Sequence, residues 1–177
     1  MPALQLHPNA RCGAAITVEA EARRPRPDAL RLTYVVTGAV GDLWVPEPAG
    51  FARTDELWKR TCFEAFLLPG PGQAYVEFNL APCRRWATYR FDTYREGMRD
   101  AADVTPSEIT VDSSDGRLEL SASIALPASE SAAPVWRLGL TAVIEEANGN
   151  VSHWALGHPS PQPDFHNALS FVHELAA

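Results

Sequence analysis

The stretch Leu57–Arg99 reads LWKRTCFEAFLLPGPGQAYVEFNLAPCRRWATYRFDTYREGMR, and it decides the fold class. Three short runs with alternating or apolar character follow one another closely in it, at Thr61–Leu68, Ala74–Leu80 and Arg85–Phe91. The linker LPGPGQ between the first two has the composition of a hairpin turn. Strand-like runs that are joined by such short turns predict neighbouring strands of an antiparallel sheet.

The same pattern continues on both sides of this stretch. Further strand-like runs lie at Ala14–Ala20, Leu30–Thr37, Asp42–Val45, Glu108–Asp112, Leu118–Ile124, Trp136–Glu145 and Val151–Leu156, and Leu169–Leu175 closes the chain. The best helix signal is one short turn within Thr54–Arg60, which Thr54 or Asp55 could cap. We therefore predict an all-β fold, either a sandwich or a barrel of antiparallel strands with few short helical turns, as one domain over residues 1–177.

Composition narrows the function classes. The chain has 46% hydrophobic and 21% charged residues, as ordinary soluble globular proteins do. Its net charge of −7 disfavours a nucleic-acid partner. No apolar run approaches the roughly 20 residues that cross a bilayer, and the beginning, MPALQLHPNARCG, lacks the pattern of a secretory signal. We expect a cytoplasmic bacterial protein without a membrane partner, and the oligomeric state stays open.

The three cysteines, Cys12, Cys62 and Cys83, are odd in number and have no CxxC spacing. A zinc site or a disulfide framework is therefore not expected. We expect Cys62 to be a small buried apolar residue, with a Cys62–Cys83 bridge as the alternative.

Alternation assigns the residues of the second strand to two faces, because residues two apart in a strand share a face. Val76, Phe78 and Leu80 form an apolar set that is predicted to face the core. The opposite set contains Glu77 and Asn79, and two interpretations of it stay open. It is either an ordinary solvated sheet face or the wall of a polar pocket.

The third strand favours a pocket. Its alternation brings Trp86 and Arg90 to one face and Tyr89 to the other, so large aromatic residues occur on both faces. An arginine beside glutamate and asparagine on a sheet face can order a pocket through charge-assisted hydrogen bonds.

A second group of candidate functional residues lies in HWALGHP (residues 153–159) and PDFH (residues 163–166). Metal binding by His153, His158 and His166 with Asp164 is one interpretation, although no HxxxH or HExxH spacing supports it. The other is an ordered loop whose histidines bond backbone groups. We predict no metal.

Catalytic signatures are lacking. The chain contains no GxSxG, P-loop or dinucleotide-binding motif. Glu64 and Glu77 could be imagined as a glycosidase pair, which requires carboxyl groups roughly 5–9 Å apart. Nothing in the sequence singles these two out for that chemistry, and we predict that the protein is not an enzyme.

The order of these motifs resembles that of bacterial DOMON-like proteins, which are relatives of the family 9 carbohydrate-binding modules. The resemblance rests on Trp58, TCFEAFL, YVEFN, P-x3-WATYRFDTYREGM, HWALGHP and PDFH. It is close over Leu57–Met98 and looser over His153–His166. It implies a jelly-roll-like sandwich that binds a ligand and performs no chemistry on it. Members of the wider superfamily bind sugars or heme b.

The resemblance also implies a set of ligand-contacting residues for a carbohydrate or a similar small polar ligand. Sugar binders of this type clamp the sugar between tryptophans, for which the candidates are Trp58, Trp86 and Trp154. The candidate hydrogen-bonding residues are Glu64, Glu77, Asn79, Arg90 and Arg95. The other candidate contacts are Tyr89, Tyr94, His153, His158, Asp164 and His166. Flat aromatic rings match the apolar face of a pyranose, and planar polar side chains match its hydroxyl pairs.

Two alternatives stay beside the sugar hypothesis. Heme-binding relatives use a methionine with a histidine or lysine as axial ligands, so heme b would be held here by Met98 and His153, or by His158 or His166. The other alternative is a protein-interaction module without a small ligand. Its partner surface would contain Tyr89, Tyr94 and Arg95, which are residue types that are common in interaction hot spots.

Overall fold

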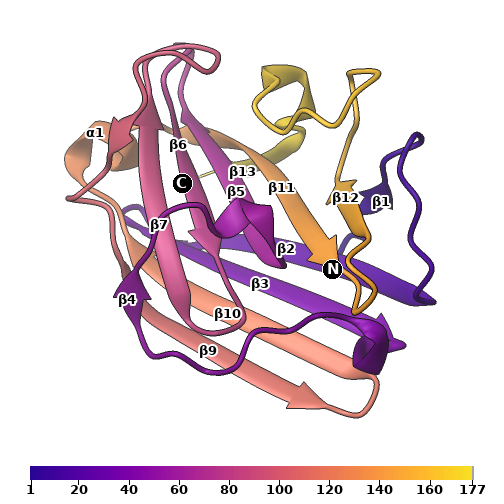
Figure 1. Cartoon of the computed structure of the whole chain (residues 1–177). Helices are drawn as coiled ribbons and strands as arrows, with labels where there is room; N and C mark the ends of the chain where they lie inside the picture. The colour runs from indigo at the N-terminus through magenta and orange to yellow at the C-terminus, as the bar shows by residue number, and fades with distance from the viewer. Residues whose placement is uncertain (177) are drawn as a thin grey trace.

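The structure, a computed structural model, describes residues 1–176, and two packed β-sheets dominate it (Figure 1). The larger sheet runs in the order β1 (Gln5–Leu6), β12 (Val151–Ala155), β11 (Val135–Glu145), β5 (Cys62–Pro69), β6 (Tyr75–Leu80), β7 (Arg85–Phe91) and β4 (Ala52–Arg53). Two further strands extend it: β13 (His173–Ala176) beside β11, and β8 (Arg99–Asp100) beside β7. The smaller sheet runs in the order β2 (Ile16–Arg26), β3 (Ala29–Gly38), β10 (Arg117–Ala125) and β9 (Pro106–Ser114).

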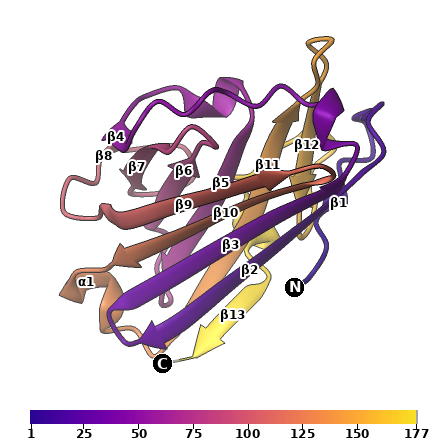
Figure 2. The same cartoon turned by 90° about the horizontal axis from the view of Figure 1, so that it is seen from below.

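The pairing is antiparallel throughout except between β4 and β7, which are parallel. Seen from below, the four strands of the smaller sheet form one layer and the strands of the larger sheet cross behind them (Figure 2). The helical elements are single turns: η1 (Val40–Asp42), η2 (Leu57–Lys59), α1 (Ala128–Ser131) and η3 (Ala168–Ser170). The predicted all-β sandwich with few short helical turns is therefore confirmed.

Three local predictions need correction. The strand predicted at Ala14–Ala20 continues to Arg26 despite its proline, because β3 pairs with it across an irregularity between Arg23 and Arg26. The strand predicted at Asp42–Val45 is wrong, since this segment makes only a single bridge, from Leu43 to Glu146. The helical turn predicted within Thr54–Arg60 exists as η2, but Glu56 precedes it at φ 63° and no side chain caps it.

The main core lies between the two sheets, and the predicted face of β6 points into it. Val76, Phe78 and Leu80 are buried there together with side chains from the smaller sheet. Each such side chain stabilises the fold by roughly 1.5–3 kcal/mol through its removal from water. No helix within residues 1–176 has the length and apolar character needed to span a membrane.

The opposite face of the larger sheet carries a second, aromatic core. Phe66 stacks on Phe171 at 5.8 Å between ring centroids, and Tyr75 stacks on Phe91 at 4.8 Å. Phe171 follows η3, so the C-terminal segment covers part of this face, and Figure 1 shows that segment in yellow beside β11 and β12. Gly139 in β11 permits this contact, since a Cβ there would lie 2.8 Å from Phe171. The face is thus neither a plain solvated surface nor fully covered.

Candidate ligand-binding site

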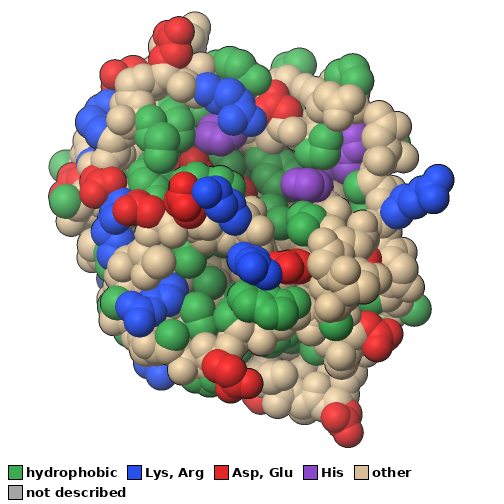
Figure 3. Space-filling view, viewed as in Figure 1, with side chains coloured by type: hydrophobic (Ala, Val, Ile, Leu, Met, Phe, Trp, Pro, Cys, Tyr) green, Lys and Arg blue, Asp and Glu red, His purple; other side chains and the backbone are tan. Residues whose placement is uncertain are grey.

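A pocket of about 340 Å³ opens on this outer face of the larger sheet. This volume lies within the range of small-molecule sites, roughly 300–1,000 Å³. In the space-filling view, histidine and charged side chains gather around a hollow on this face (Figure 3). Of the residues predicted to contact a sugar or other polar ligand, those that line the pocket are Trp58, Glu64, Glu77, Arg95, His153 and His166.

Glu64 and Glu77 are buried pocket-lining carboxyls on neighbouring strands. Glu64 in β5 pairs with Asn79, and Phe66 pairs with Glu77 in β6, so the two glutamates are diagonal neighbours on one face. Such neighbours are roughly 7 Å apart. Their exposed fractions are only 2% and 5%. The sheet register therefore places the two acids together in the pocket. The alternation within each strand did not distinguish a pocket wall from a solvated surface.

Hydrogen bonding differs between the two carboxyls. Asn79 Nδ2 donates to Glu77 Oε1 at 2.7 Å, and Asn79 itself is fully buried. Glu64 Oε1 is buried and has no hydrogen-bond partner within residues 1–176. A buried polar atom without a partner is costly, so the Glu64 carboxyl is a place where a ligand group would be stabilising.

The pKa values of both carboxyls are raised. Burial raises the pKa of Glu64 well above its usual value, and the nearby charge of Glu77 raises it further. Burial raises the pKa of Glu77 to about 7, against the lowering effects of the Asn79 hydrogen bond and the Arg95 charge. Each shift follows from the cost of holding a negative charge away from water.

A chain of hydrogen bonds fixes His166 against the sheet. The Arg95 backbone N–H donates to the Tyr75 hydroxyl at 3.2 Å, and this hydroxyl lies 2.8 Å from His166 Nδ1. The donor of this second bond is the Tyr75 O–H or the imidazole N–H according to the tautomer of His166. Nε2 faces Glu77 Oε2 at 3.9 Å. Burial and the Arg95 charge lower the pKa of His166 to about 4, so the ring is neutral at physiological pH.

Trp58 and Arg95 belong to the walls of the pocket. Trp58 sits in η2, and its ring meets the edge of Tyr89 at 6.0 Å between centroids. Arg95 Nη2 donates to Asp164 at 2.9 Å, and the Tyr94 hydroxyl donates to the same carboxylate at 2.9 Å. Asp164 and Tyr94 do not themselves line the pocket. They hold Arg95, whose side chain is half exposed, at its rim.

Two of the three predicted stacking tryptophans are not in the pocket, and this is a correction. Trp86 is opposite Leu80, and Trp154 is opposite Ala142, so both point to the inner face of the larger sheet. Each is 8% exposed and belongs to the main core. Neither can stack on a ligand in this pocket, because the sheet itself lies between.

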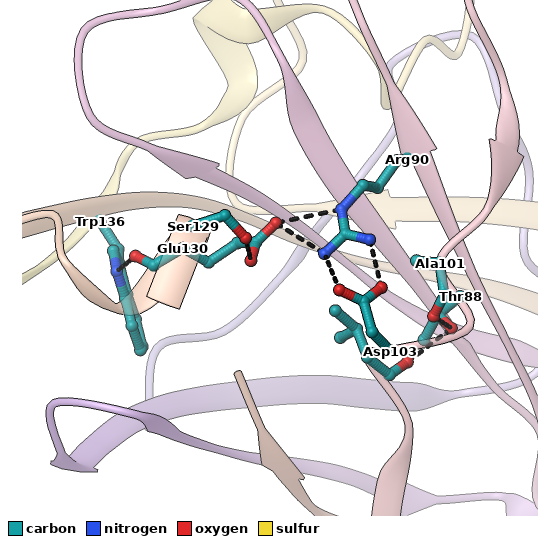
Figure 4. Close-up of polar contacts among 8 residues, drawn as sticks. Thr88, Arg90, Ala101, Asp103, Ser129, Glu130 and Trp136 are labelled. Carbon is teal, nitrogen blue, oxygen red and sulfur yellow. Dashed lines mark hydrogen bonds and ion pairs between the residues drawn. The ribbon is translucent and has the colours of Figure 1, made fainter. Parts of the chain in front are cut away.

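Arg90 is also misassigned by the prediction. It is on the same inner face as Trp86, near the sheet margin, and its guanidinium lies between Asp103 and Glu130 (Figure 4). Glu130 is 5% exposed, and its backbone carbonyl accepts a hydrogen bond from Trp136 Nε1. Arg90 therefore ties α1 and the loop that contains Asp103 to β7, which is a structural role.

Tyr89 and His158 lie outside the pocket for different reasons. Tyr89 shares the pocket's face but is buried, and its hydroxyl donates to Asp55 at 2.5 Å. It therefore cannot join Tyr94 and Arg95 in an exposed partner surface. His158 Nε2 lies 2.8 Å from the Gln5 carbonyl oxygen, as the ordered-loop interpretation predicts, and its ring packs against His7.

The structure also shows the surroundings of the candidate metal ligands and of the cysteines. Within the described part of the chain, no group of three or more His, Cys, Asp or Glu side chains is arranged to hold a metal ion. Cys62 is fully buried with a free thiol, as predicted, and Cys83 is a separate free thiol.

Several lining residues were missed, or were considered only for heme, in the sequence analysis. They are Phe91, Met98, Val143, Pro163 and Phe165. Alternation could have found Phe91, which lies two residues from Tyr89 on the same face of β7. Phe165 stands between Asp164 and His166 in a loop, where no periodicity indicates its direction.

Comparison with known proteins establishes the fold. No protein-family model matches the chain, and no curated protein sequence matches it. A crystal structure of a candidate carbohydrate-binding protein from Bacteroides uniformis is similar, with a TM-score of 0.61, 14% identity, and coverage of 98% of this chain and 85% of that one. A family 9 carbohydrate-binding module from Caldicellulosiruptor kristjanssonii is also similar. Its glucose complex gives a TM-score of 0.55, with 12% identity and coverage of 98% and 82%, and its cellotriose complex gives 0.52, with 12% identity and coverage of 98% and 80%.

Proposed function

We propose that this protein is a non-catalytic module that binds a carbohydrate or a similar small polar ligand in the pocket beside Trp58. The observation that carries the proposal is that the Trp58 ring and two buried carboxyls, Glu64 and Glu77, line the same cavity of ligand size. An aromatic ring and planar polar groups suit the two kinds of surface that a pyranose presents. Glucose and cellotriose are the ligands of the similar family 9 module, which supports the class.

Binding fits the two carboxyls better than glycoside hydrolysis does. Hydrolysis needs one carboxyl that is protonated and a second that is held ionised at the working pH. Here the pKa of both Glu64 and Glu77 is raised, and neither is stabilised as an anion by an ion pair at hydrogen-bonding distance. Both carboxyls therefore suit hydrogen bonding to a ligand more than division into an acid and a nucleophile.

Titration calorimetry tests the proposal with glucose, cellobiose and cellotriose on the wild type and on Trp58→Ala. We expect saturable binding to the wild type and at least a tenfold loss of affinity in Trp58→Ala. Trp44→Ala is the matched control, because Trp44 is 37% exposed and does not line the pocket. Equal affinity in Trp58→Ala and the wild type, or no binding of any sugar, would remove the basis for the proposal.

Heme b binding is the second candidate, because Met98 lines the same pocket as His153 and His166. A thioether and a neutral imidazole are suitable axial ligands for heme iron. Burial lowers the pKa of His153, which keeps its ring neutral. Titration with hemin, followed by the Soret band, tests this candidate on the wild type and on Met98→Leu. A spectrum of unbound hemin with the wild type would rule it out.

A further inference from the structure

Among residues 1–176, the pocket holds two acids, Glu64 and Glu77, and no lysine or arginine side chain within ion-pair distance of either. The titratable and charged groups near the carboxyls of Glu64 and Glu77 are Cys62, Tyr34, Tyr75, Tyr89, Arg95, His153 and His166. Both histidines are neutral at physiological pH, because burial lowers the pKa of each. Arg95 is the remaining cation, and its guanidinium already donates to Asp164 at 2.9 Å.

Two carboxyl oxygens in this part of the pocket have no hydrogen-bond donor within range among residues 1–176. Glu64 Oε1 has no partner among the described residues. Glu77 Oε2 lies 3.9 Å from His166 Nε2, which is too long for a hydrogen bond. A ligand group that donates several hydrogen bonds and accepts none would match these oxygens. A primary ammonium group has this character, with three donors and no acceptor.

The aromatic rings around the carboxyls also favour a cationic ligand. Trp58, Phe91 and Phe165 line the pocket with them. A cation that is held by carboxylates gains further attraction from aromatic faces within about 6 Å. A metal ion is a poor alternative, because Ca²⁺ and Mg²⁺ take about six or more oxygen ligands and two glutamates supply few. Two acids together with apolar rings therefore favour an organic cation over a metal ion as the ligand.

We propose that the pocket takes a ligand with a protonated primary amine, seated between Glu64 and Glu77 and beside Trp58; within the carbohydrate class this is an amino sugar. This inference rests on the proposed function for its site, and it narrows the ligand class. The amine supplies the counter-charge that the chain itself does not provide. Burial disfavours the charged form of both carboxyls in the free protein, and a neighbouring cation favours it. Binding of the amine should therefore ionise the carboxyls and be accompanied by release of protons from the site.

Three sugars that differ at one position test the inference by titration calorimetry at pH 7: glucosamine, glucose and N-acetylglucosamine. Glucosamine carries the cation, glucose has a neutral hydroxyl in its place, and N-acetylglucosamine keeps the nitrogen without the charge. We expect glucosamine to bind at least tenfold more tightly than glucose, and N-acetylglucosamine to bind no more tightly than glucose. Cyclohexylamine, a six-membered ring with an amine and no hydroxyls, is the fourth probe.

Conservative variants connect the preference to the two acids. Glu64→Gln and Glu77→Gln keep the shape of the site but cannot ionise beside a bound cation, so each should reduce the preference for glucosamine over glucose at least fivefold. Glu108→Gln is the matched control, since Glu108 is an exposed residue of β9 in the other sheet. Near-UV circular dichroism checks that each variant is folded. The comparison of probes on the wild type stands even where a variant fails to fold.

The outcomes separate this inference from the proposed function. Glucose or N-acetylglucosamine binding as tightly as glucosamine overturns the amine inference and leaves sugar binding standing. Binding of cyclohexylamine without binding of any sugar supports the amine site and overturns the sugar proposal. Absence of binding by all four probes at millimolar concentration overturns both.

Discussion

The hydroxyl of Tyr75 lies 2.8 Å from Nδ1 of His166, and this contact joins the sheet to the loop that forms one wall of the pocket. The same hydroxyl accepts the backbone N–H of Arg95 from another wall. One phenol on β6 thus holds together two segments that are about 70 residues apart in the chain. The shape of the pocket depends on tertiary contacts of this kind more than on any single strand.

Replacement of Tyr75 by phenylalanine should therefore weaken the binding of the ligand severalfold without unfolding the protein. The lost hydrogen bond is expected to lower the free energy of unfolding by about 1 kcal/mol. Calorimetry and urea denaturation measure the two effects. Thr33→Val is the control, because it removes a side-chain hydrogen bond, to Ser121, in the smaller sheet and away from the pocket. Unchanged affinity in Tyr75→Phe would contradict a role for this contact in shaping the site.

Truncation of Trp86 should affect stability and not ligand contacts. Because Trp86 belongs to the main core, Trp86→Ala is expected to lower the free energy of unfolding by about 3–5 kcal/mol. Trp44→Ala, at an exposed position, should lower it by less than about 1 kcal/mol. Chemical denaturation monitored by far-UV circular dichroism compares them, with Trp86→Phe as a milder variant. A small loss for Trp86→Ala would show that this side chain is not part of the core.

The buried carboxyls should make the protein less stable as the pH rises from about 5 to 8. The pKa of Glu77 is about 7 in the folded state and 4.5 for an unperturbed group, so the folded state binds more protons in this window. The stability that this shift contributes is present below about pH 4.5 and is lost as the pH rises from there through 7. Glu64 acts in the same direction, because its pKa is also raised. Urea denaturation at pH 5, 6, 7 and 8 measures the slope.

A double variant, Glu64→Gln with Glu77→Gln, should reverse the slope below neutral pH. The pKa of His166 is lowered from 6.5 to about 4, so the unfolded state binds more protons between these values. With the two acids gone, stability should rise as the pH increases from 4 to 6.5. A slope of the same sign in the wild type and the double variant would mean that other groups control the pH dependence.

Replacement of Arg90 should destabilise the protein and leave ligand binding intact. Arg90→Met leaves Glu130 buried without its ionic partner, which is expected to cost about 3 kcal/mol. Arg99→Met is the control, because Arg99 and Asp92 form an exposed pair that should contribute less than about 1 kcal/mol. Thermal denaturation and ligand titration compare the two variants. Loss of ligand affinity in a folded Arg90→Met variant would show that Arg90 takes part in ligand binding.

The period of two in the strands was enough to predict an all-β fold and its core, and the resemblance of the motifs favoured a sandwich over a barrel. Alternation is a local property of an extended backbone, so Val76, Phe78 and Leu80 could be assigned to one buried face without knowledge of their neighbours. The same alternation placed Glu77 on the opposite face. Turn residues such as LPGPGQ marked where the strands end, and both signals agree with the observed β5, β6 and β7.

Only the tertiary structure decided which face of each strand carries the site and what covers it. The β7 pattern alone has aromatic residues on both faces of the strand. The register with β6 decides between the faces: Trp86 is opposite Leu80, so Trp86 and Arg90 point to the inner face. His166 and Phe165 reach the pocket from a loop, whose direction follows no period. The sequence by itself determined the strands and the core, because these depend on local geometry and hydrophobicity. The pocket required the register between strands and the packing of the C-terminal segment, which are contacts between residues far apart in the chain.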